Sequence, residues 1–418
     1  MVWGSFFLFF KKMLTTIQIC AAALAIDLIK KTAGAALVIK KNLITRRTHM
    51  KPNYVKSLLI SEIKSVAANP QNYCYNPATD FTRKRKLSME KILAGIIGME
   101  SGSITNELID LFDASSDTLA TPAFVQQGDK IKPEAFQKIF DEFSGKLMAG
   151  FADEMPVLAV DGSDVQTPTN PKDTGSFYTG RNGKKSCNLL HINALYDLNH
   201  HIYPDVAIQK SKEANEHKAF QEMVDRPGIP MALVIADRGY ESFNNMAHIQ
   251  EKGWFFLIRV KDGACGIKNG LELPGTDSFD VDISLKLTRK KTNEVKELFK
   301  DKNHYRSISS TQLFDYLPLK NKKAEAARFY GLHFRIVRFP ISESSYETVV
   351  TNLGTGKYPP TELKKLYASR WGIETSFRDL KYTMGMLNFH SKKVMCIQQE
   401  IYGHIIFLTD ENLSICVI

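Results

Sequence analysis

The sequence is poor in the residues that build disulfide-stapled or zinc-binding proteins. Its 418 residues include six cysteines, which are scattered along the chain and form no Cys-x-x-Cys pair. This pattern excludes a disulfide framework and a structural zinc site, and it fits a reducing compartment. Internal repeats and low-complexity runs are also lacking, and an apolar fraction of 44% excludes disorder as the dominant state. The length allows two or three domains.

Most of the excess positive charge lies in the first part of the chain. The formal net charge is +10, but residues 1–49 hold eight lysines and arginines against Asp27, and residues 50–418 carry a net charge of only +3. Residues 13–29, between lysine pairs, imitate a signal peptide but are too short and too interrupted for a membrane span. We therefore interpret the first segment as a doubtful upstream extension, with translation expected to start at Met50. DNA binding then has to rest on local placement of charge.

Residues 50–150 alternate helical apolar patterns with polar breaks, which predicts a helical N-terminal domain. The basic run Arg83–Lys86 precedes an apolar helix; a solvated helix entry is its ordinary explanation, and DNA contact is the alternative. Residues 121–143 indicate two helices joined by a turn at Gly128. That shape is compatible with a small DNA-binding unit and equally with a plain helical bundle.

From residue 156 the pattern changes to strands separated by helices. Apolar runs such as VLAV, CNLLHINALYDL and MALVIA predict buried strands, of which the first follow one another closely and are expected to pair antiparallel. Residues 261–345 hold shorter alternating runs, typical of a β-rich insertion. Thr361 can cap a long helix that runs to about Tyr382. The predicted fold class is α/β (α+β), a mixed sheet flanked by helices.

Two carboxylates stand where predicted strands end. Asp161 follows the run VLAV in the motif DGSD, and Asp237 follows MALVIA in the motif ADRGY. Ligands of α/β proteins commonly bind at this edge of the sheet. A helix cap or a turn is the ordinary explanation for either residue alone, but the occurrence of both favours a shared site.

The predicted long helix carries a polar face beside an apolar stripe. Five residues of the stretch YASRWGIETSFRDLK are spaced 3, 4, 4 and 3 apart, which puts them on one helical face. They are Tyr367, Arg370, Glu374, Arg378 and Lys381. A polar stripe is usually a solvated face, but one acid among three bases and a tyrosine suits the gripping of a phosphate beside a carboxylate.

This combination suits cleavage or transfer of phosphodiesters. Two divalent ions roughly 3.5–4 Å apart stabilise the attacking and leaving oxygens of such a reaction. Mg²⁺ prefers oxygen ligands and keeps some of its waters, so two or three carboxylates suffice to hold it. Arginines and lysines then position the strand by its phosphates.

In these residues the chain resembles insertion-sequence transposases with a DDE catalytic domain on a ribonuclease-H-like fold. The resemblance is to the branch marked by a Y-x2-R-x3-E-x6-K signature, and it covers roughly residues 50–405. The signature is matched at every position by Tyr367, Arg370, Glu374 and Lys381. The motifs around Asp161 and Asp237 match the other two acidic motifs, and the β-rich stretch matches the insertion domain of this branch.

The resemblance implies a metal-binding catalytic triad of Asp161, Asp237 and Glu374, which would hold two Mg²⁺ or Mn²⁺ ions. It also implies a division of the chain. The expected parts are the extension 1–49, a helical and possible DNA-binding domain 50–150, a ribonuclease-H-like catalytic domain 151–260 and 346–405, the β-rich insertion 261–345, and an atypical tail 406–418 that suggests a frameshift or truncation.

By the same resemblance, Tyr367, Arg370 and Lys381 would contact the transposon end near the cleaved phosphate. Arg378 lies on the same predicted face. Arg238, beside the second aspartate, is a further candidate for DNA contact, with local turn contacts as the alternative.

The implied activity is cut-and-paste transposition by a bacterial, cytoplasmic protein that joins the nucleoid when bound to DNA. Its partners would be double-stranded DNA at the terminal inverted repeats, target DNA and a second copy of the chain, without any membrane. Water would attack at the element's end to free a 3′-hydroxyl. That hydroxyl would attack the opposite strand to form a hairpin, which would be reopened before strand transfer. Two alternatives are a remnant that only binds end DNA, and a nuclease without strand transfer.

A base flipped near such a hairpin needs an aromatic partner. Trp254 and Trp371 are candidates, but both occupy strand or helix positions where we expect core packing. Tyr305 and Phe314 of the insertion are equally arguable, so the partner stays unassigned.

Two smaller groups are interpreted as ordinary surface features. Arg181, Lys184 and Lys185 lie in a loop near the first aspartate, where solvated charge is expected and phosphate contact is the alternative. His200 and His201 are interpreted as a turn, because no third imidazole or cysteine has ligand spacing.

Overall fold

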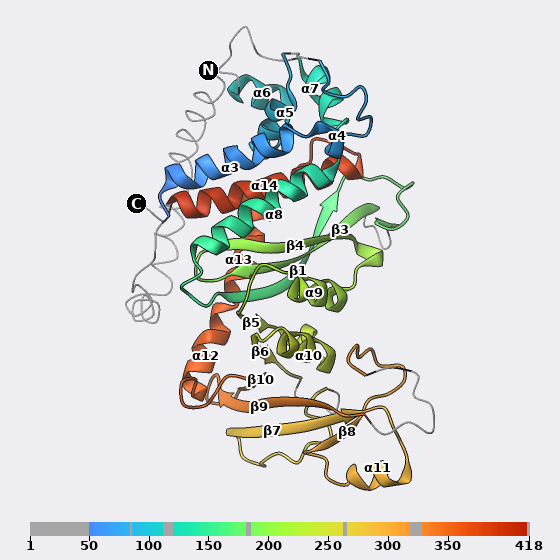
Figure 1. Cartoon of the computed structure of the whole chain (residues 1–418), viewed down its shortest axis with the longest axis vertical. Coiled ribbons are helices and arrows are strands. Elements are labelled where there is room, and N and C mark those ends of the chain that lie inside the picture. The colour runs from blue at the N-terminus through green and yellow to red at the C-terminus, as the bar shows by residue number, and fades with distance from the viewer. Residues whose placement is uncertain are drawn as a thin grey trace. The chain divides into compact units, whose positions relative to one another are not determined.

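The computed structural model describes residues 50–83, 86–111, 120–180, 185–261, 266–317, 319 and 328–415. The predictions for residues 1–49, for Lys84 and Arg85 of the basic run, and for the last three residues lie outside this part. The chain forms two compact units (Figure 1). The helical unit holds the described residues up to Phe151, Thr167–Thr169, and those from Leu380 on; the sheet unit holds Ala152–Gln166 and Asn170–Asp379.

The helical unit is a bundle whose helices begin at prolines or capped residues. Its helices are α3 (Pro52–Ala67), α4 (Pro70–Tyr73), α5 (Met89–Ile97), α6 (Ile104–Leu111), α7 (Thr121–Gly128), α8 (Pro133–Gly150) and α14 (Val394–Ile415). Proline occupies the first turn of α3 and α8, where its missing N–H costs nothing. Ser88 caps α5 by accepting the N–H of Lys91. The described part of residues 52–150 is thus helical, with a short turn between α7 and α8, whereas a separate domain 50–150 stays a prediction.

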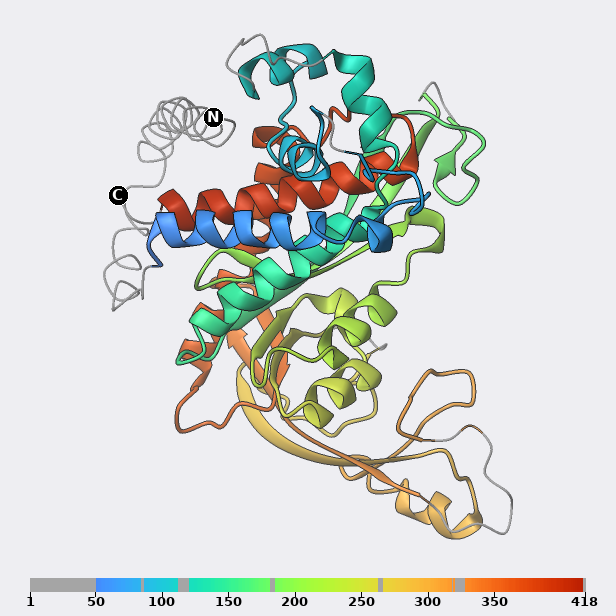
Figure 2. The same cartoon turned by 45° about the horizontal axis from the view of Figure 1, so that its top comes forward.

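The last helix of the chain completes this unit. Figure 2 shows α14 alongside α3 and α8, and α14 also packs on α5. Residues 380–405 lie in the helical unit rather than with the sheet as expected, and residues 406–415 continue α14, while the frameshift or truncation of the tail stays a prediction. The physical reason is the apolar stripe, because Ile401, Ile405 and Leu408 are spaced four and three apart and are buried.

The sheet unit contains a ten-stranded mixed sheet with helices on both faces. Its first strands are β1 (Val157–Thr167), β2 (Phe177–Tyr178), β3 (Cys187–Asp197), β4 (Ile202–Lys210), β5 (Leu233–Ala236) and β6 (Phe255–Arg259). Their order is β2-β3-β1-β5-β6, with β4 also paired to β3, and the sheet continues beyond β6 with β10 (Tyr346–Thr351), β9 (Tyr330–Pro340), β7 (Phe279–Thr288) and β8 (Tyr305–Ser307). β3 and β4 are antiparallel, whereas β1, β5 and β6 are parallel. The predicted mixed sheet flanked by helices is confirmed.

Alternate residues of β1 and β5 face two separate cores. α9 (Glu216–Asp225) and α10 (Phe243–Glu251) pack on the face that includes Leu158 and Val160. α12 (Pro360–Ser369) packs on the opposite face, where Leu363 meets Ile235 and its neighbours. Because side chains alternate along a strand, Asp161 belongs to the α12 face and Gly162 to the α9 face.

The β-rich insertion extends this same sheet. It supplies β7 (Phe279–Thr288), α11 (Asn293–Leu298), β8 (Tyr305–Ser307) and β9 (Tyr330–Pro340), and β10 (Tyr346–Thr351) joins them to β6. Backbone pairing between strands thus connects the insertion to the strands that carry the acidic motifs.

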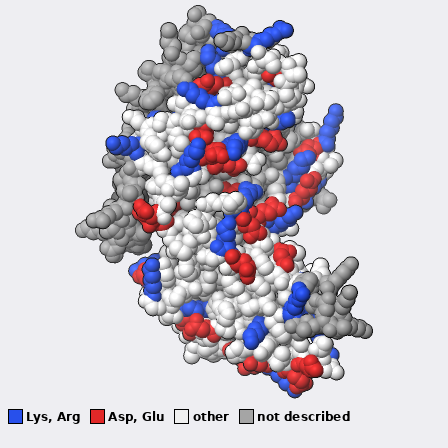
Figure 3. All heavy atoms as spheres, viewed as in Figure 1, with Lys and Arg blue, Asp and Glu red and all other residues white. Residues whose placement is uncertain are grey.

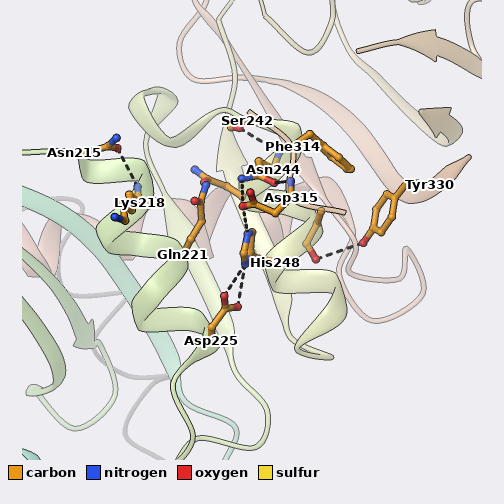
Figure 4. A network of polar contacts seen from close by, with 12 residues as sticks. Asn215, Lys218, Gln221, Asp225, Ser242, Asn244, His248, Phe314, Asp315 and Tyr330 are labelled. Carbon is orange, nitrogen blue, oxygen red and sulfur yellow. Dashed lines mark hydrogen bonds and ion pairs between the residues drawn. The ribbon is translucent and has the colours of Figure 1, made fainter. Parts of the chain in front are cut away.

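A polar network also fastens the insertion to α10 (Figure 4). His248 lies between two carboxylates, with Nδ1 2.9 Å from Asp225 and Nε2 2.9 Å from Asp315 of the insertion. Asn244 donates to Asp315 over 2.8 Å and accepts its backbone N–H over 2.9 Å.

Among the helices that the structure describes, none has the length and apolar character that a membrane span requires.

Candidate active site

Asp161 and Asp237 are placed next to each other by the strand register. In the parallel pair of β1 and β5, Val160 lies opposite Ala236, so the two aspartates are the next residues on neighbouring strands. β1 continues to Thr167, so Asp161 lies within the strand rather than after its end as expected. Asp237 does follow β5 directly, and its Oδ1 accepts the N–H of Gly239 over 2.7 Å.

The surroundings of Asp161 disfavour its charged form. Burial raises its pKa to about 6, and the carboxylates of Asp237 and Glu374 add to this increase. The N–H of Gly162, 2.9 Å from Oδ1, and the guanidinium of Arg370 act in the opposite direction. The three predicted triad members therefore lie within electrostatic range of one another.

Glu374 is carried by a helix that the sequence predicted only in part. The expected single helix to about Tyr382 is wrong: it is divided into α12, α13 (Trp371–Arg378) and a π-helical turn at Asp379–Thr383. Arg370 keeps helical backbone angles, but the five polar residues do not share one exposed face because Tyr367 and Arg370 are buried. π-helical turns are rare and occur frequently at functional sites.

Arg370 and Tyr367 are buried rather than displayed to solvent. Arg370 donates from Nη2 to Oε1 of Glu374 over 2.7 Å, and its side chain is 9% exposed. Tyr367 packs in the core beneath α12, where burial raises the pKa of its hydroxyl. Arg370 thus lies beside the triad and orients the glutamate, and the ring of Tyr367 is 5.9 Å from its guanidinium.

The remaining basic candidates are distributed differently. Arg378 and Arg238 are exposed on the sheet unit, where they remain available to a polyanion. Lys381 lies in the π-helical turn and belongs to the helical unit. On the face drawn in Figure 3, basic and acidic side chains are interspersed, in agreement with the low net charge of residues 50–418.

The two tryptophans have opposite environments. Trp254 is 2% exposed and donates its indole N–H to the carbonyl of Ile229, as core packing predicts. Trp371 is 62% exposed, so the expectation of core packing is wrong there. It lies next to Arg370, whose guanidinium is 5.5 Å from the ring centroid. Phe314 of the insertion is buried in the core of the α9 face.

The predicted histidine turn and the predicted basic loop belong to the sheet unit. His201 has a left-handed backbone with φ of 60°, and the ring of His200 lies 2.7 Å from the carboxylate of Asp197, so this pair forms a turn as predicted. Lys185 is exposed, and its loop neighbours Arg181 and Lys184 lie outside the described residues.

Sequence reasoning missed the side chains that hold the elements carrying the triad in place. The hydroxyls of Tyr203 on β4 and Ser376 on α13 are 2.7 Å apart, which fixes the helix of Glu374 on the sheet. His191 on β3 contacts two further carboxylates behind β1. The only sequence signal for His191 was its position in a strand run, because the partners come from distant segments.

The donor set at this site suits a hard divalent cation. All three side chains offer carboxylate oxygens, the ligands that Mg²⁺ and Mn²⁺ accept. Asp161 in particular is a half-buried carboxylate near two others, a charge arrangement that a cation would relieve. Within the described ranges, no group of three His, Cys, Asp or Glu side chains is drawn together closely enough to hold a metal.

Comparison with known proteins identifies the family. The transposase DDE domain model matches residues 152–409. The chain is similar to transposase InsG for insertion sequence element IS4 of Escherichia coli (strain K12), with 20% identity over 77% of this chain and 68% of that protein. It is also similar to the transposase for insertion sequence element IS231B of Bacillus thuringiensis subsp. berliner, with 24% identity over 78% of this chain and 72% of that protein.

A solved structure of the piggyBac transposase synaptic complex with hairpin DNA aligns with a TM-score of 0.41 and 11% identity, over 89% of this chain and 77% of that one. The family match spans more than half of the sequence and includes Asp161, Asp237 and Glu374. The chain therefore belongs to the transposase DDE domain family, as its resemblance to insertion-sequence DDE transposases implied.

Proposed function

We propose that this chain catalyses cut-and-paste transposition of an insertion sequence, with Asp161, Asp237 and Glu374 as its catalytic triad. The observation that carries the proposal is the register of β1 and β5, which sets the two aspartates side by side. The influence of Glu374 on the pKa of Asp161 supports the third member. The reaction would cleave phosphodiesters at the element's ends and then transfer the freed 3′-hydroxyls to target DNA.

The three carboxylates would hold the divalent ions. Two ions, Mg²⁺ or Mn²⁺, would supply activation of the attacking oxygen and charge stabilisation of the leaving oxygen. Asp161 and Asp237 are fixed by backbone N–H groups, and Glu374 is held by Arg370, so each carboxylate has a defined direction before DNA binds. This preorganisation lowers the cost of assembling the site.

The basic and aromatic residues around the triad would position DNA. Arg378 and Arg238 are exposed and suit phosphate contact, whereas Arg370 would reach a phosphate beside Glu374 and orient that glutamate at the same time. We propose Tyr367 and Lys381 as further contacts to the transposon end. The exposure of Trp371 supports it as the partner of a flipped base, since a buried ring could not stack.

The proposed substrates are the terminal inverted repeats and a target duplex, brought together by two copies of the chain in the nucleoid of a bacterial cytoplasm. The helical unit, with α7 and α8 joined by a short turn, is the proposed binder of the terminal repeat. Its role would be sequence recognition, whereas the sheet unit would perform the cleavage.

The test is end cleavage by the full chain. DNA carrying the element's terminal repeats is incubated with the protein and Mg²⁺, and nicks are mapped on a denaturing gel. We expect nicking at the repeat end with the wild type and with Asp153→Asn, an exposed control carboxylate, and none with Asp161→Asn. Nicking that survives Asp161→Asn would contradict the proposed triad.

Two alternative functions give different results in the same assay. A gel shift without cleavage by any preparation would favour a remnant that only binds the ends. Cleavage without joining to a target plasmid would favour a nuclease that lacks strand transfer.

A further inference from the structure

A histidine lies between two carboxylates on the face of β1 opposite to Asp161. His191 of β3 has Nδ1 2.8 Å from Oδ1 of Asp164 and Nε2 3.1 Å from Oε1 of Glu216. Asp164 is on β1, three residues after Asp161, and Glu216 is the first residue of α9. One imidazole thus joins two neighbouring strands and a helix at the level of the proposed active site.

The pair of His191 and Glu216 lies directly against the backbone of β1. A Cβ added at Gly162 would be 2.5 Å from Nε2 of His191, closer than real Cβ contacts allow, and 3.0 Å from Oε1 of Glu216, which is tighter than most of them. The glycine therefore permits the close approach of these two side chains to the strand. On the other side, the N–H of Gly162 donates to Oδ1 of Asp161 over 2.9 Å.

The pair of His191 and Glu216 therefore supports β1 from the face opposite to Asp161. Gly162 and Asp164 share the face of Leu158 and Val160, which α9 and α10 cover, whereas Asp161 faces α12. His191 is 8% exposed. The side chains of Asp164 and Glu216 are 49% and 46% exposed, but the imidazole is enclosed, so His191 acts on the reaction through the position of the strand rather than by touching DNA.

The charges of the cluster favour a fixed geometry. Burial lowers the pKa of His191, but its contacts with Glu216 and Asp164 outweigh burial and raise that pKa above its ordinary value. The contact with His191 lowers the pKa of Glu216. Nδ1 of His191 hydrogen-bonds to Asp164, whereas Nε2 meets Glu216 as an ion pair at 3.1 Å, so one imidazolium can hold two carboxylates at once. Ser211 adds a hydrogen bond to Asp164 over 3.2 Å.

We propose that His191 and Glu216 form a positioning pair that holds the β1 backbone at Gly162, so that Asp161 takes its place in the catalytic triad. The inference rests on the proposed function, because it assigns a partner to the proposed catalytic aspartate. His191→Ala is expected to lower kcat for end cleavage by about 10–100-fold, since a misplacement of about 1 Å can cost that much. The Mg²⁺ concentration at half-maximal cleavage is expected to rise, while KM for end DNA stays unchanged.

The matched control is His248→Ala. His248 also lies between two carboxylates of the sheet unit, at 2.9 Å from each, but it fastens α10 to the insertion. Both variants remove one bridging imidazole and are expected to lower Tm. Only His191→Ala should change the Mg²⁺ dependence. Equal changes in the two variants would show a general loss of stability and would overturn the positioning role.

A second pair of variants separates contact from charge. Glu216→Gln keeps a carbonyl oxygen that can accept from the imidazole, and it is expected to retain most of the kcat that Glu216→Ala loses. Gly162→Ala should reproduce the defect of Glu216→Ala, because its methyl group displaces the pair. Equal defects in Glu216→Gln and Glu216→Ala would assign a role to the charge itself and contradict positioning by contact.

A readout without metal completes the test. Hydrogen–deuterium exchange of the β1 peptide 157–167 is measured in EDTA, and exchange is expected to be faster in His191→Ala than in the wild type or His248→Ala. Unchanged exchange together with unchanged Mg²⁺ dependence would refute the inference. Asp161→Asn separates failure of the proposed function from failure of the positioning pair. If Asp161→Asn cleaves normally, the proposed function fails. If Asp161→Asn is inactive while His191→Ala is fully active, only the positioning pair is refuted.

Discussion

The hydroxyls of Tyr203 and Ser376 lie 2.7 Å apart in the core of the sheet unit, although 173 positions separate the two residues in the chain. Tyr203 projects from β4 and Ser376 from α13, and both are buried. Ser376 is two residues after Glu374, so this hydrogen bond sets the depth at which the glutamate's helix lies on the sheet.

Ser376→Ala is therefore expected to lower the free energy of unfolding by about 1–3 kcal/mol, because it leaves the buried hydroxyl of Tyr203 without its partner. Adding Tyr203→Phe should restore much of the loss, since the unsatisfied hydroxyl is then gone. Chemical denaturation of the two single variants and the double variant measures the coupling. Additive losses would show that the two hydroxyls do not depend on each other.

Arg370→Lys is expected to reduce cleavage by about 10–100-fold, as the loss of a hydrogen bond between charged groups of about 1.5–3 kcal/mol implies. The reason is that a lysine cannot reproduce the guanidinium geometry that orients Glu374. Affinity for end DNA, measured by gel shift, should change less than cleavage does. Arg328→Lys is the control, because this exposed arginine of the insertion has no proposed role at the site; a larger effect there would contradict the prediction.

Trp371→Ala should leave the thermal unfolding temperature nearly unchanged, because most of its ring is in solvent. If it stacks on a flipped base, hairpin formation should fall while the first nick persists, and Trp371→Phe should retain part of the activity. Trp254→Ala, in the core, should instead destabilise the protein by about 3–5 kcal/mol. Normal hairpin yield in Trp371→Ala would exclude this ring as the stacking partner.

His390 predicts an alkaline loss of stability in the helical unit. Burial lowers its pKa, but contacts with Glu107 and Glu400 dominate and raise the pKa to about 10. Its pKa is thus higher folded than unfolded, so the stabilisation is complete below pH 6.5 and is lost as pH rises toward 10. The free energy of unfolding should fall by up to about 1.4 kcal/mol per pH unit in that window. His390→Gln should show a shallower pH dependence in denaturation series from pH 6 to 10.

Asp410 in α14 predicts a stabilising substitution. It is fully buried, has no hydrogen-bond partner among the described residues, and burial raises its pKa to about 7. Because its pKa is higher folded than unfolded, ionisation destabilises the fold as pH rises from about 4 to 7. Asp410→Asn should therefore raise Tm at pH 8 and change it little at pH 4. An equal gain at both pH values would attribute the effect to packing rather than to charge.

The sequence allowed the strands and the acidic motifs to be predicted because their signals are local. Asp161 and Asp237 follow apolar runs, and each run itself predicts a buried strand. The division of the glutamate's helix had no such signal, since no proline marks Arg370. The exposure of Trp371 could have been foreseen: Ile373 and Phe377 form the buried stripe, and a residue two positions before Ile373 points about 200° away from it. The pairing of Tyr203 with Ser376 depends on contacts between distant segments, which a single sequence does not disclose.

The position of α14 also bears on the order in which the protein can fold during synthesis. The helices α3, α5 and α8 leave the ribosome early, but the helix that packs on all three is translated more than 240 residues after α8. The whole sheet unit is made in between. The nascent N-terminal helices must therefore wait with an apolar face uncovered, and a stalled ribosome would leave that face exposed to chaperones and proteases until α14 arrives.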